Sequence, residues 1–195
     1  GRTAPELRAA LVSPLPTPAL PLALAAAVFK GGDGKGAVVL STLMAARDLD
    51  LVEKNGTFSN TLEVVVTATN YGGKAFAGDR ATLTLALKPD SVQRLRAGGF
   101  RILSSIDLPP GRYQLRVAAL EGNTKRAGSV VYDLDVPDFS KEKLSMSDRA
   151  LTSSTSGLVP TARPKDPLAK MLPGPMTTYR DFVQGDEIAL FAEVY

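Results

Sequence analysis

Hydrophobic and polar residues alternate through the middle of the chain, which is the pattern of β-strands with one buried face. The segment 112–120 shows it after a rigid Pro-Pro-Gly corner at 109–111. In 128–136 one face is apolar and the other acidic, with Val130, Tyr132, Leu134 and Val136 against Asp133 and Asp135. These two segments predict a β-hairpin, and its apolar side requires a second sheet to cover it.

The same alternation recurs along the chain between turn signals such as the glycine-rich 31–36 and Asn55-Gly56. It predicts seven strands, at 20–29, 37–45, 61–69, 81–87, 100–107, 112–120 and 128–136. Seven short antiparallel strands are typical of a β-sandwich of immunoglobulin or fibronectin type III character. We therefore expect an all-β fold of this class.

Tyr113 stands directly after the Pro-Gly corner, at the start of the sixth predicted strand. Such sandwiches place a tyrosine there whose hydroxyl bonds to the upstream backbone while its ring packs in the core. We predict this structural role for Tyr113, and a ligand contact is the alternative.

The two ends of the chain have sequence patterns that differ from the strand alternation of its middle. Residues 3–12 predict a short helix with Thr3 as its N-cap and Pro5 and Glu6 in its first turn. Prolines then punctuate the chain up to Pro21, which favours an extended segment, and a helical turn or two is expected between Pro89 and Gly99.

After Pro137 the pattern predicts a polar hinge, a short strand at 144–152, a Pro-rich crossover at 153–181 and a strand at 187–195. The expected organisation is a helix and Pro-rich linker over 1–19, an immunoglobulin-like sandwich over 20–137, and a hinge, crossover and part of a second β unit over 138–195. The last strand carries three apolar residues that need a cover, Ile188, Leu190 and Val194. An exposed strand edge and self-association are therefore expected risks.

The composition excludes several classes of chemistry. The chain of 195 residues has no Cys, no His and no Trp. Ser-His-Asp and Cys-His catalysis, H-E-x-x-H zinc sites and disulfides are therefore excluded. The 23 Lys and Arg nearly balance 20 Asp and Glu, giving a net charge of +3. This balance argues against a nucleic-acid partner.

A locally basic region in the second half consists of Arg94, Arg96, Arg101, Arg112 and Arg116. It lacks the interleaved aromatic side chains that single-stranded nucleic acids stack on, so solvated strand faces are the simpler interpretation. The apolar stretches are broken by proline and too short to span a bilayer, so no membrane insertion is expected.

Three short patterns partly match known functional motifs, but each lacks a feature that the motif requires. Gly31 and Gly36 have the spacing of the two glycines in the phosphate-binding Walker motif, but Ala37 occupies the position of its required Lys. Ser140-Lys141-Glu142-Lys143 matches S-x-x-K but lies in a charged hinge without its companion motifs.

The third pattern is a possible calcium site at Asp133, Asp135 and Asp138, of which the first two are more simply the solvent face of a strand. A pair of glycosidase carboxylates cannot be chosen from the sequence. We therefore assign no catalytic, cofactor-binding or metal-binding residue and no cofactor.

Four runs, at 108–119, 128–139, 144–147 and 190–195, resemble the region that follows the von Willebrand factor type A domain in bacterial VWFA-related proteins. The resemblance covers most of the chain from about Leu20 onward. It implies an exported multidomain protein, periplasmic or at the cell surface, whose β-sandwich modules follow an adhesion-type domain. The metal site of that preceding domain uses an Asp-x-Ser-x-Ser motif, which this sequence lacks, so no functional residue is carried over.

Two functions of different classes follow. The first is a non-catalytic β-sandwich module, a spacer or a protein-interaction domain with a protein partner. The second is a carbohydrate-binding or carbohydrate-processing accessory domain, which would need exposed aromatic rings. Because Tyr113 and Tyr132 are predicted to point inward, only Tyr71, Tyr179 and Tyr195 remain for that role, and the first function is preferred. A pair of buried carboxylates in a cleft would favour an enzyme instead.

Overall fold

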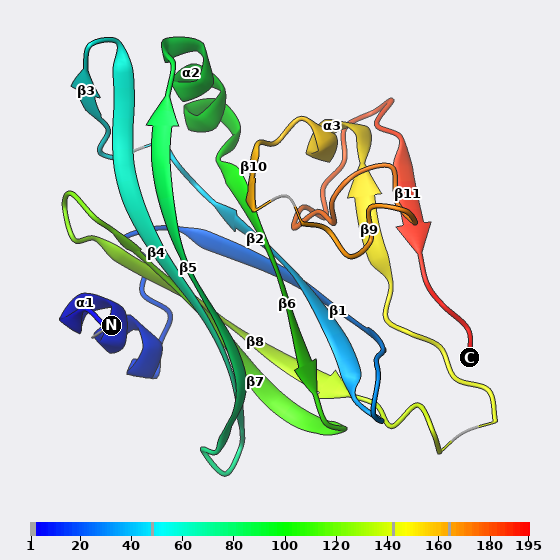
Figure 1. The fold of residues 1–195 in the computed structure, drawn as a ribbon. Coiled ribbons are helices and arrows are strands. Elements are labelled where there is room, and N and C mark those ends of the chain that lie inside the picture. Colours follow the sequence, from blue (N-terminus) through cyan, green and yellow to red (C-terminus); the bar gives the residue numbers. More distant parts are fainter. Residues whose placement is uncertain (1–2, 48, 142, 164) are drawn as a thin grey trace.

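The computed structural model describes residues 3–47, 49–141, 143–163 and 165–195. It is mostly β, with antiparallel sheets packed face to face as a sandwich, which confirms the predicted all-β class (Figure 1). Asp48, Glu142 and Pro164, which fall within predicted segments, lie outside the described residues, as do Gly1 and Arg2.

The first sheet contains β1 (Leu22–Lys30), β2 (Gly36–Met44), β6 (Phe100–Leu108) and β10 (Thr161–Arg163), in that order. The first three strands are antiparallel, and β10 runs parallel to β6. Asp33 and Gly34 have positive φ angles of 52° and 69° between β1 and β2. The glycine-rich segment is therefore a hairpin turn, as its composition predicts.

The second sheet contains β3 (Val52–Lys54), β4 (Thr57–Asn70), β5 (Ala75–Leu87), β7 (Gly111–Glu121) and β8 (Ala127–Val136). β4 pairs with β5 on one side and with β3 and β7 on the other, and β8 follows β7. The predicted turn at Asn55-Gly56 joins β3 to β4, and both residues have positive φ. All seven predicted strands are present, although β4 and β5 are longer than the alternation indicates and β3 was not expected.

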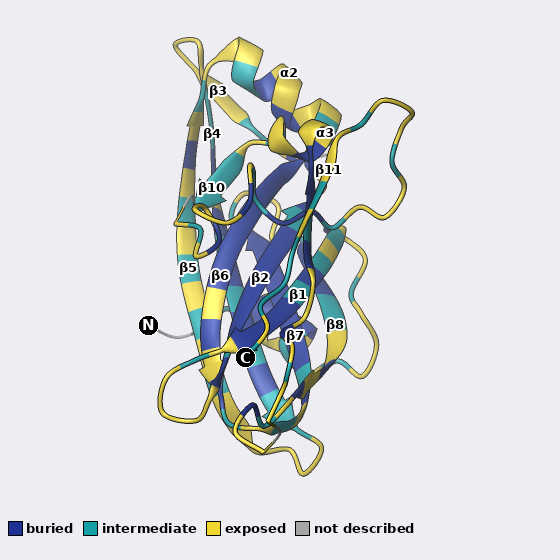
Figure 2. Cartoon of the chain, turned by 90° about the vertical axis from the view of Figure 1, so that its right-hand side faces the viewer, coloured by how far each residue is buried: buried dark blue, intermediate teal, exposed yellow. Residues whose placement is uncertain are grey.

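The main core lies between the two sheets. Val38, Leu40 and Ile102 of the first sheet and Leu115 and Val117 of the second are among its buried residues. Figure 2 shows the dark blue of buried residues running along β2 and β6. Each such side chain contributes roughly 1.5–3 kcal/mol when it leaves water, so this alternation largely determines the fold.

Helix α1 (Pro5–Val12) covers part of the outer face of the second sheet, where Leu7 and Ala10 pack against Ala118 and Leu120. The predicted N-cap Thr3 is wrong: the cap position is Ala4, which makes no side-chain hydrogen bond. Pro5 begins the helix because its missing N–H would have no partner in the first turn.

Helix α2 (Pro89–Gly98) confirms the predicted helical turn. It buries Val92 and Leu95, and it ends at Gly99, which has a φ of 71°.

The C-terminal part contributes β9 (Ala150–Ser153), α3 (Ser154–Gly157) and β11 (Ile188–Phe191). It packs on the outer face of the first sheet through a second core cluster, which consists of Ala25, Ala27, Phe29 and Val39 with Ala150, Leu168, Leu172 and Met176. The predicted strands at 144–152 and 187–195 are present as shorter elements, and the predicted crossover contains α3 and β10. The three-part domain division stays a prediction, and the C-terminal part shares this second cluster with the sandwich.

Candidate functional site

The feature most suited to binding is a two-stranded ribbon formed by 145–153 and 188–195, hereafter the ribbon. Its regular part pairs β9 with β11, so that Leu190 lies opposite Leu151. It continues through a bridge between Met146 and Val194 and through backbone bonds between Ser145 and Tyr195. Figure 2 shows β11 in front of β1 on the side that faces the viewer.

The ribbon is fixed to β1 by backbone and aromatic contacts. The Val28 N–H donates to Asp148 Oδ2 at 3.0 Å, and the Asp148 N–H donates to the Val28 carbonyl at 2.9 Å. Phe191 stacks on Phe29 with ring centroids 5.7 Å apart. These contacts turn one face of β11, that of Ala189 and Phe191, toward the first sheet.

Tyr195 anchors the far end of the ribbon. Its hydroxyl accepts the Lys30 N–H at 2.9 Å and donates to the carboxylate of Glu193. Burial, together with the hydrogen bond to Glu193, raises the pKa of Tyr195 to about 12. Its ring meets Phe139 edge to face, so Tyr195 acts as an anchor rather than an exposed aromatic platform.

Aliphatic side chains on the ribbon remain exposed. Ile188 and Leu190 alternate with the two inward residues and are 50% and 57% exposed. The two residues of the β-bridge are also exposed, Met146 by 56% and Val194 by 66%. The expectation that Ile188, Leu190 and Val194 lack a cover is confirmed for the described residues, and β11 has no strand partner except β9 among them.

A polar pocket of about 350 Å³ adjoins these aliphatic residues, and we call it the arginine pocket. It is lined by Ala26, Tyr132, Asp148, Arg149, Leu151, Arg180 and Leu190. Its walls therefore come from β1, β8, the ribbon and the crossover. Leu151 and Leu190 belong to both the pocket and the ribbon, so the two features form one continuous surface.

Both arginines of this pocket lack a carboxylate partner within the described residues. The Arg180 Nη1 donates to the carbonyls of Thr177 at 3.2 Å and Tyr179 at 2.8 Å. The Arg149 guanidinium makes neither a hydrogen bond nor an ion pair with another described residue. One oxygen of Asp148 is already occupied by Val28, so the pocket offers donors to an anionic group.

Tyr132 corrects one prediction. The alternation places it in the core, but its residue is 37% exposed and lines the arginine pocket. β8 is an edge strand, and at an edge the opposing sheet covers an inward-facing side chain only partly. Tyr71 and Tyr179 are exposed as expected, whereas Tyr195 is largely enclosed by its anchor contacts.

Tyr113 has the predicted structural geometry. Its residue is 2% exposed, and its hydroxyl donates to the Pro109 carbonyl at 2.8 Å. Phe76 packs edge to face against its ring, with centroids 5.3 Å apart. Burial raises the pKa of Tyr113, which keeps the hydroxyl protonated as a donor.

None of the described residues in the chemical patterns weighed from the sequence lines the arginine pocket. The Ser140 hydroxyl donates to Asp138 Oδ1 at 2.6 Å, and this bond and the Ser140 N–H hold the pKa of Asp138 below its usual range. Asp135 pairs with Arg112 at 3.6 Å on the exposed face of β8. Within the described part of the chain, no three acidic residues gather closely enough to hold a metal ion.

Two buried charged residues tie elements together. Glu121 is fully buried and accepts from Thr124 at 2.5 Å, from the Asp50 N–H at 2.5 Å, and from Arg126 at 2.9 Å. Burial alone raises the pKa of Glu121, but these hydrogen bonds outweigh it and the pKa is lowered. These donors occupy both of its carboxylate oxygens, so Glu121 is a structural link between Asp50 and the β7–β8 turn.

The second such residue, Arg101, is 2% exposed on the outer face of β6 beneath the C-terminal part. Its Nη2 donates to the Ser156 carbonyl at 2.8 Å and hydroxyl at 3.1 Å, whereas its Nη1 has no hydrogen-bond partner among the described residues. Burial lowers the pKa of Arg101, and Asp166 and Tyr179 oppose that shift. Because its bonds reach across to Ser156 of the C-terminal part, we assign Arg101 to the packing of the two layers.

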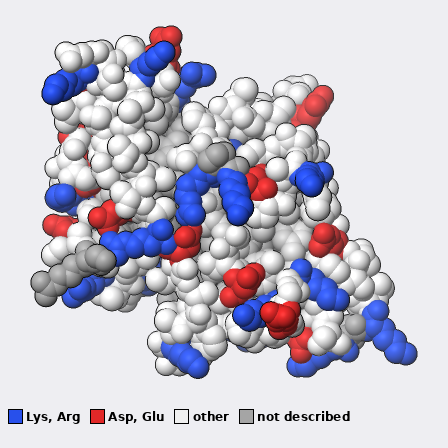
Figure 3. Space-filling model, viewed as in Figure 1, with Lys and Arg blue, Asp and Glu red and all other residues white. Residues whose placement is uncertain are grey.

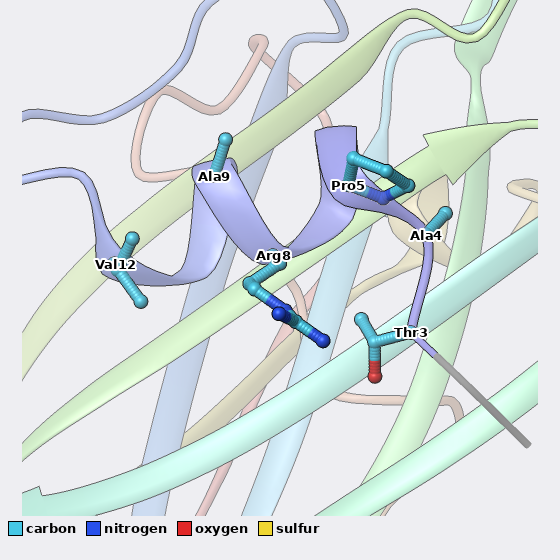
Figure 4. A pocket seen from close by; sticks show the side chains of 6 residues that line it. All are labelled: Thr3, Ala4, Pro5, Arg8, Ala9 and Val12. Atoms are coloured by element: carbon cyan, nitrogen blue, oxygen red, sulfur yellow. The ribbon is translucent and has the colours of Figure 1, made fainter.

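Another hollow, of about 630 Å³, lies along α1 (Figure 4). Thr3, Ala4, Pro5, Arg8, Ala9 and Val12 line it. All six belong to one helix and the residues before it, and no other described element forms an opposing wall. It offers a ligand little more than the side of a helix.

Charge and hydropathy add two observations. Figure 3 shows Lys and Arg interspersed with Asp and Glu across the face it presents, without a large patch of one sign. Of the helices in the described ranges, none is both long and apolar enough to span a membrane.

No protein-family profile matches the chain, and no curated protein matches it either.

Proposed function

We propose that the protein is a non-catalytic β-sandwich module that binds a protein partner through the ribbon and the adjoining arginine pocket. The observation that carries this proposal is the exposure of Ile188, Leu190, Met146 and Val194 on a ribbon whose other face is packed. Contiguous exposed aliphatic residues mark interaction surfaces in soluble domains. The unpaired edge of β11 adds backbone donors and acceptors that a partner strand can use.

We assign the sandwich to the immunoglobulin and fibronectin type III group. The strand order supports it, because β1, β2 and β6 form one sheet and β5, β4, β7 and β8 form the other. The bond from Tyr113 to Pro109 before the start of β7 also supports it, since such domains carry this tyrosine at the same corner.

We further propose that the module belongs to a larger exported bacterial protein of the VWFA-related kind. Two of the runs that carry the resemblance, 144–147 and 190–195, pair with each other at Met146 and Val194. Phe139, from a third run, packs on Tyr195. These contacts join the runs into one structural unit. Fractionation of cells that express the full gene would test the location, and a purely cytosolic signal would contradict it.

Carbohydrate binding is the second candidate, and Tyr132 is the observation that favours it. Its partly exposed ring lies beside Asp148, Arg149 and Arg180, and an aromatic ring beside charged groups is a suitable site for a sugar. A glycan array with the purified protein tests it. Specific sugar binding that Tyr132→Ala abolishes would favour this function over the first.

The main proposal is tested by site-specific photo-crosslinking in envelope extracts, with a benzophenone residue at position 190 or, as a control, at position 52. Val52 is 53% exposed on β3, far from the ribbon in sequence and in sheet order. The protein captured from position 190 alone is then purified and its Kd measured.

We expect the double variant Ile188→Ser, Leu190→Ser to bind that protein at least about tenfold more weakly, because both side chains lose apolar contact area. Val52→Ser removes an equally exposed aliphatic side chain and should leave the Kd unchanged. Equal weakening by both variants, or capture from both positions alike, contradicts the proposal.

A further inference from the structure

The arginine pocket presents two guanidinium groups on the same surface as the exposed aliphatic residues. Arg149 and Arg180 both line it, and neither forms an ion pair with a described carboxylate. Arg180 is held in place by two backbone carbonyls, which leaves its Nε and Nη2 for another acceptor. Carboxylate groups, like phosphates, match the planar donor geometry of a guanidinium group.

Among the described residues that line the pocket, Asp148 alone has an acidic side chain. Its Oδ2 accepts the Val28 N–H at 3.0 Å, which commits this carboxylate to holding the ribbon on β1. Asp148 therefore neutralises at most one of the two cations. The pocket keeps a net positive charge that favours an anionic group from outside.

The apolar lining restricts what kind of anion fits. Leu151 and Leu190 form a cross-strand pair that lines the pocket, and Ile188 lies two residues along the same strand as Leu190. A ligand that fills the pocket is therefore adjacent to aliphatic side chains. An extended peptide repeats every second side chain after about 7 Å, so an acidic residue in the pocket places neighbouring aliphatic residues over the ribbon.

An acidic sugar would contact a smaller part of this surface than a peptide would. It would pair with the arginines and contact the ring of Tyr132, but it would leave Ile188 and the Met146–Val194 pair in water. An acidic and aliphatic peptide covers both the charged and the apolar part. The charges and the aliphatic pairs together therefore favour a peptide.

On the basis of the partner-binding role given above, we propose that the ribbon recognises an extended protein segment that carries an acidic side chain flanked by aliphatic ones. The carboxylate of the bound segment lies between Arg149 and Arg180 and next to the ring of Tyr132. The aliphatic side chains lie on Leu151, Leu190 and Ile188. The charged contact selects the segment, and the apolar contact supplies most of the affinity.

The test begins with a display library of random twelve-residue peptides panned on the folded protein. We expect the selected peptides to be enriched in Asp or Glu with Val, Leu or Ile on both sides. Panning on the double variant Arg149→Glu, Arg180→Glu should replace the acidic preference with a basic one. Selection of the same peptides by both proteins would overturn the proposal.

One selected peptide is then labelled and its Kd measured by fluorescence anisotropy. Arg149→Gln is the cleanest variant, because its guanidinium forms no hydrogen bond or ion pair with another described residue. It should weaken binding about tenfold, with the loss disappearing at 1 M salt. Arg94→Gln removes an exposed arginine from α2 as a matched control and should have no effect. Circular dichroism and thermal unfolding establish that each variant is folded.

A competition arm separates the alternatives. Oligogalacturonate, an acidic sugar polymer, should not displace the peptide at equal charge concentration. If the display library yields no enriched peptide and this polymer binds tightly through the two arginines, the proposal is overturned. Partner binding that depends on Ile188 and Leu190 but not on either arginine would refute the acidic specificity and leave the proposed function standing. Partner binding that depends on neither set would refute both.

Discussion

The Tyr113 hydroxyl donates a 2.8 Å hydrogen bond to the carbonyl of Pro109, four residues earlier, across the corner that leads from β6 into β7. The ring is buried against Phe76, so the hydroxyl reaches the carbonyl from inside the core. The bond fixes the path of the chain between the two sheets at the point where it crosses from one to the other.

Replacing Tyr113 with Phe should lower the free energy of unfolding by about 1–2 kcal/mol, because a part-buried hydrogen bond is lost and its carbonyl acceptor is left without this donor. Urea unfolding followed by circular dichroism measures this loss. Tyr132→Phe serves as the control, because that hydroxyl bonds to no other described residue, and it should change stability by less than about 0.5 kcal/mol. A loss as small as that of the control would show that the corner does not depend on the hydroxyl.

The parts of the fold that could be predicted follow from local periodicity. The alternation of apolar and polar residues predicted seven strands and the Pro-Gly corner predicted the role of Tyr113, because each signal lies within a few residues. The ends of β4 and β5 were underestimated. The first half of β5 is exposed or only half-buried, and Gly78, Asp79 and Arg80 stand there in place of apolar residues, so no apolar alternation marks it.

The candidate site could be predicted only in part. The uncovered state of Ile188, Leu190 and Val194 was visible in their alternation, but the arginine pocket was not. Arg149 and Arg180 lie far apart in the sequence, with β9, α3 and β10 between them, and only the packing of the C-terminal part on β1 brings them together. Tyr132 was placed inward because alternation cannot show that a strand lies at the edge of its sheet.

The carboxylate of Glu121 makes stability depend on pH. Its pKa is lowered from 4.5 in the folded state, so its contribution is fully present above pH 4.5 and is lost as the pH falls through the folded value. Glu121→Gln should lower the free energy of unfolding at pH 7 by about 2 kcal/mol, because a hydrogen-bonded buried charge loses its ionic contacts.

The difference between the wild type and Glu121→Gln should shrink as the pH is lowered below 4.5. Other carboxylates with lowered pKa values, Asp138 and Asp186, titrate in both proteins and cancel in the comparison. Urea titrations at several pH values measure the difference. A constant gap between the two proteins from pH 7 to pH 3 would contradict the role given to Glu121.

Arg101 is a buried cation whose Nη2 is hydrogen-bonded and whose Nη1 has no partner among the described residues. Removing a guanidinium from water is costly, and the Ser156 carbonyl that it binds also accepts the Val159 N–H at 3.2 Å. Arg101→Met keeps much of the volume and removes the charge. It should therefore leave the free energy of unfolding within about 1 kcal/mol of the wild type or raise it.

Arg101→Ala is the matched comparison, because it removes the same charge and also leaves a cavity. It should be less stable than Arg101→Met by about 2 kcal/mol or more. Thermal unfolding of both variants measures the difference. If both variants lose the same large amount, the hydrogen bonds to Ser156 contribute more than the burial of the charge costs.

Gly128 on β8 touches the backbone of the N-terminal linker. A Cβ atom at this position would lie 1.8 Å from the Leu20 carbonyl oxygen, and the neighbouring Ser129 N–H donates to the Thr17 carbonyl at 2.9 Å. Backbone atoms cannot move aside as a flexible side chain can. Gly128→Ala should therefore lower the free energy of unfolding by about 3 kcal/mol and increase hydrogen exchange at Ser129 and Thr17.

Gly98→Ala is the control, since a Cβ there meets nothing within 4 Å. An alanine near the end of α2 should be neutral or stabilising by up to about 1 kcal/mol. Normal stability and unchanged exchange in Gly128→Ala would show that the linker does not pack on β8 in solution.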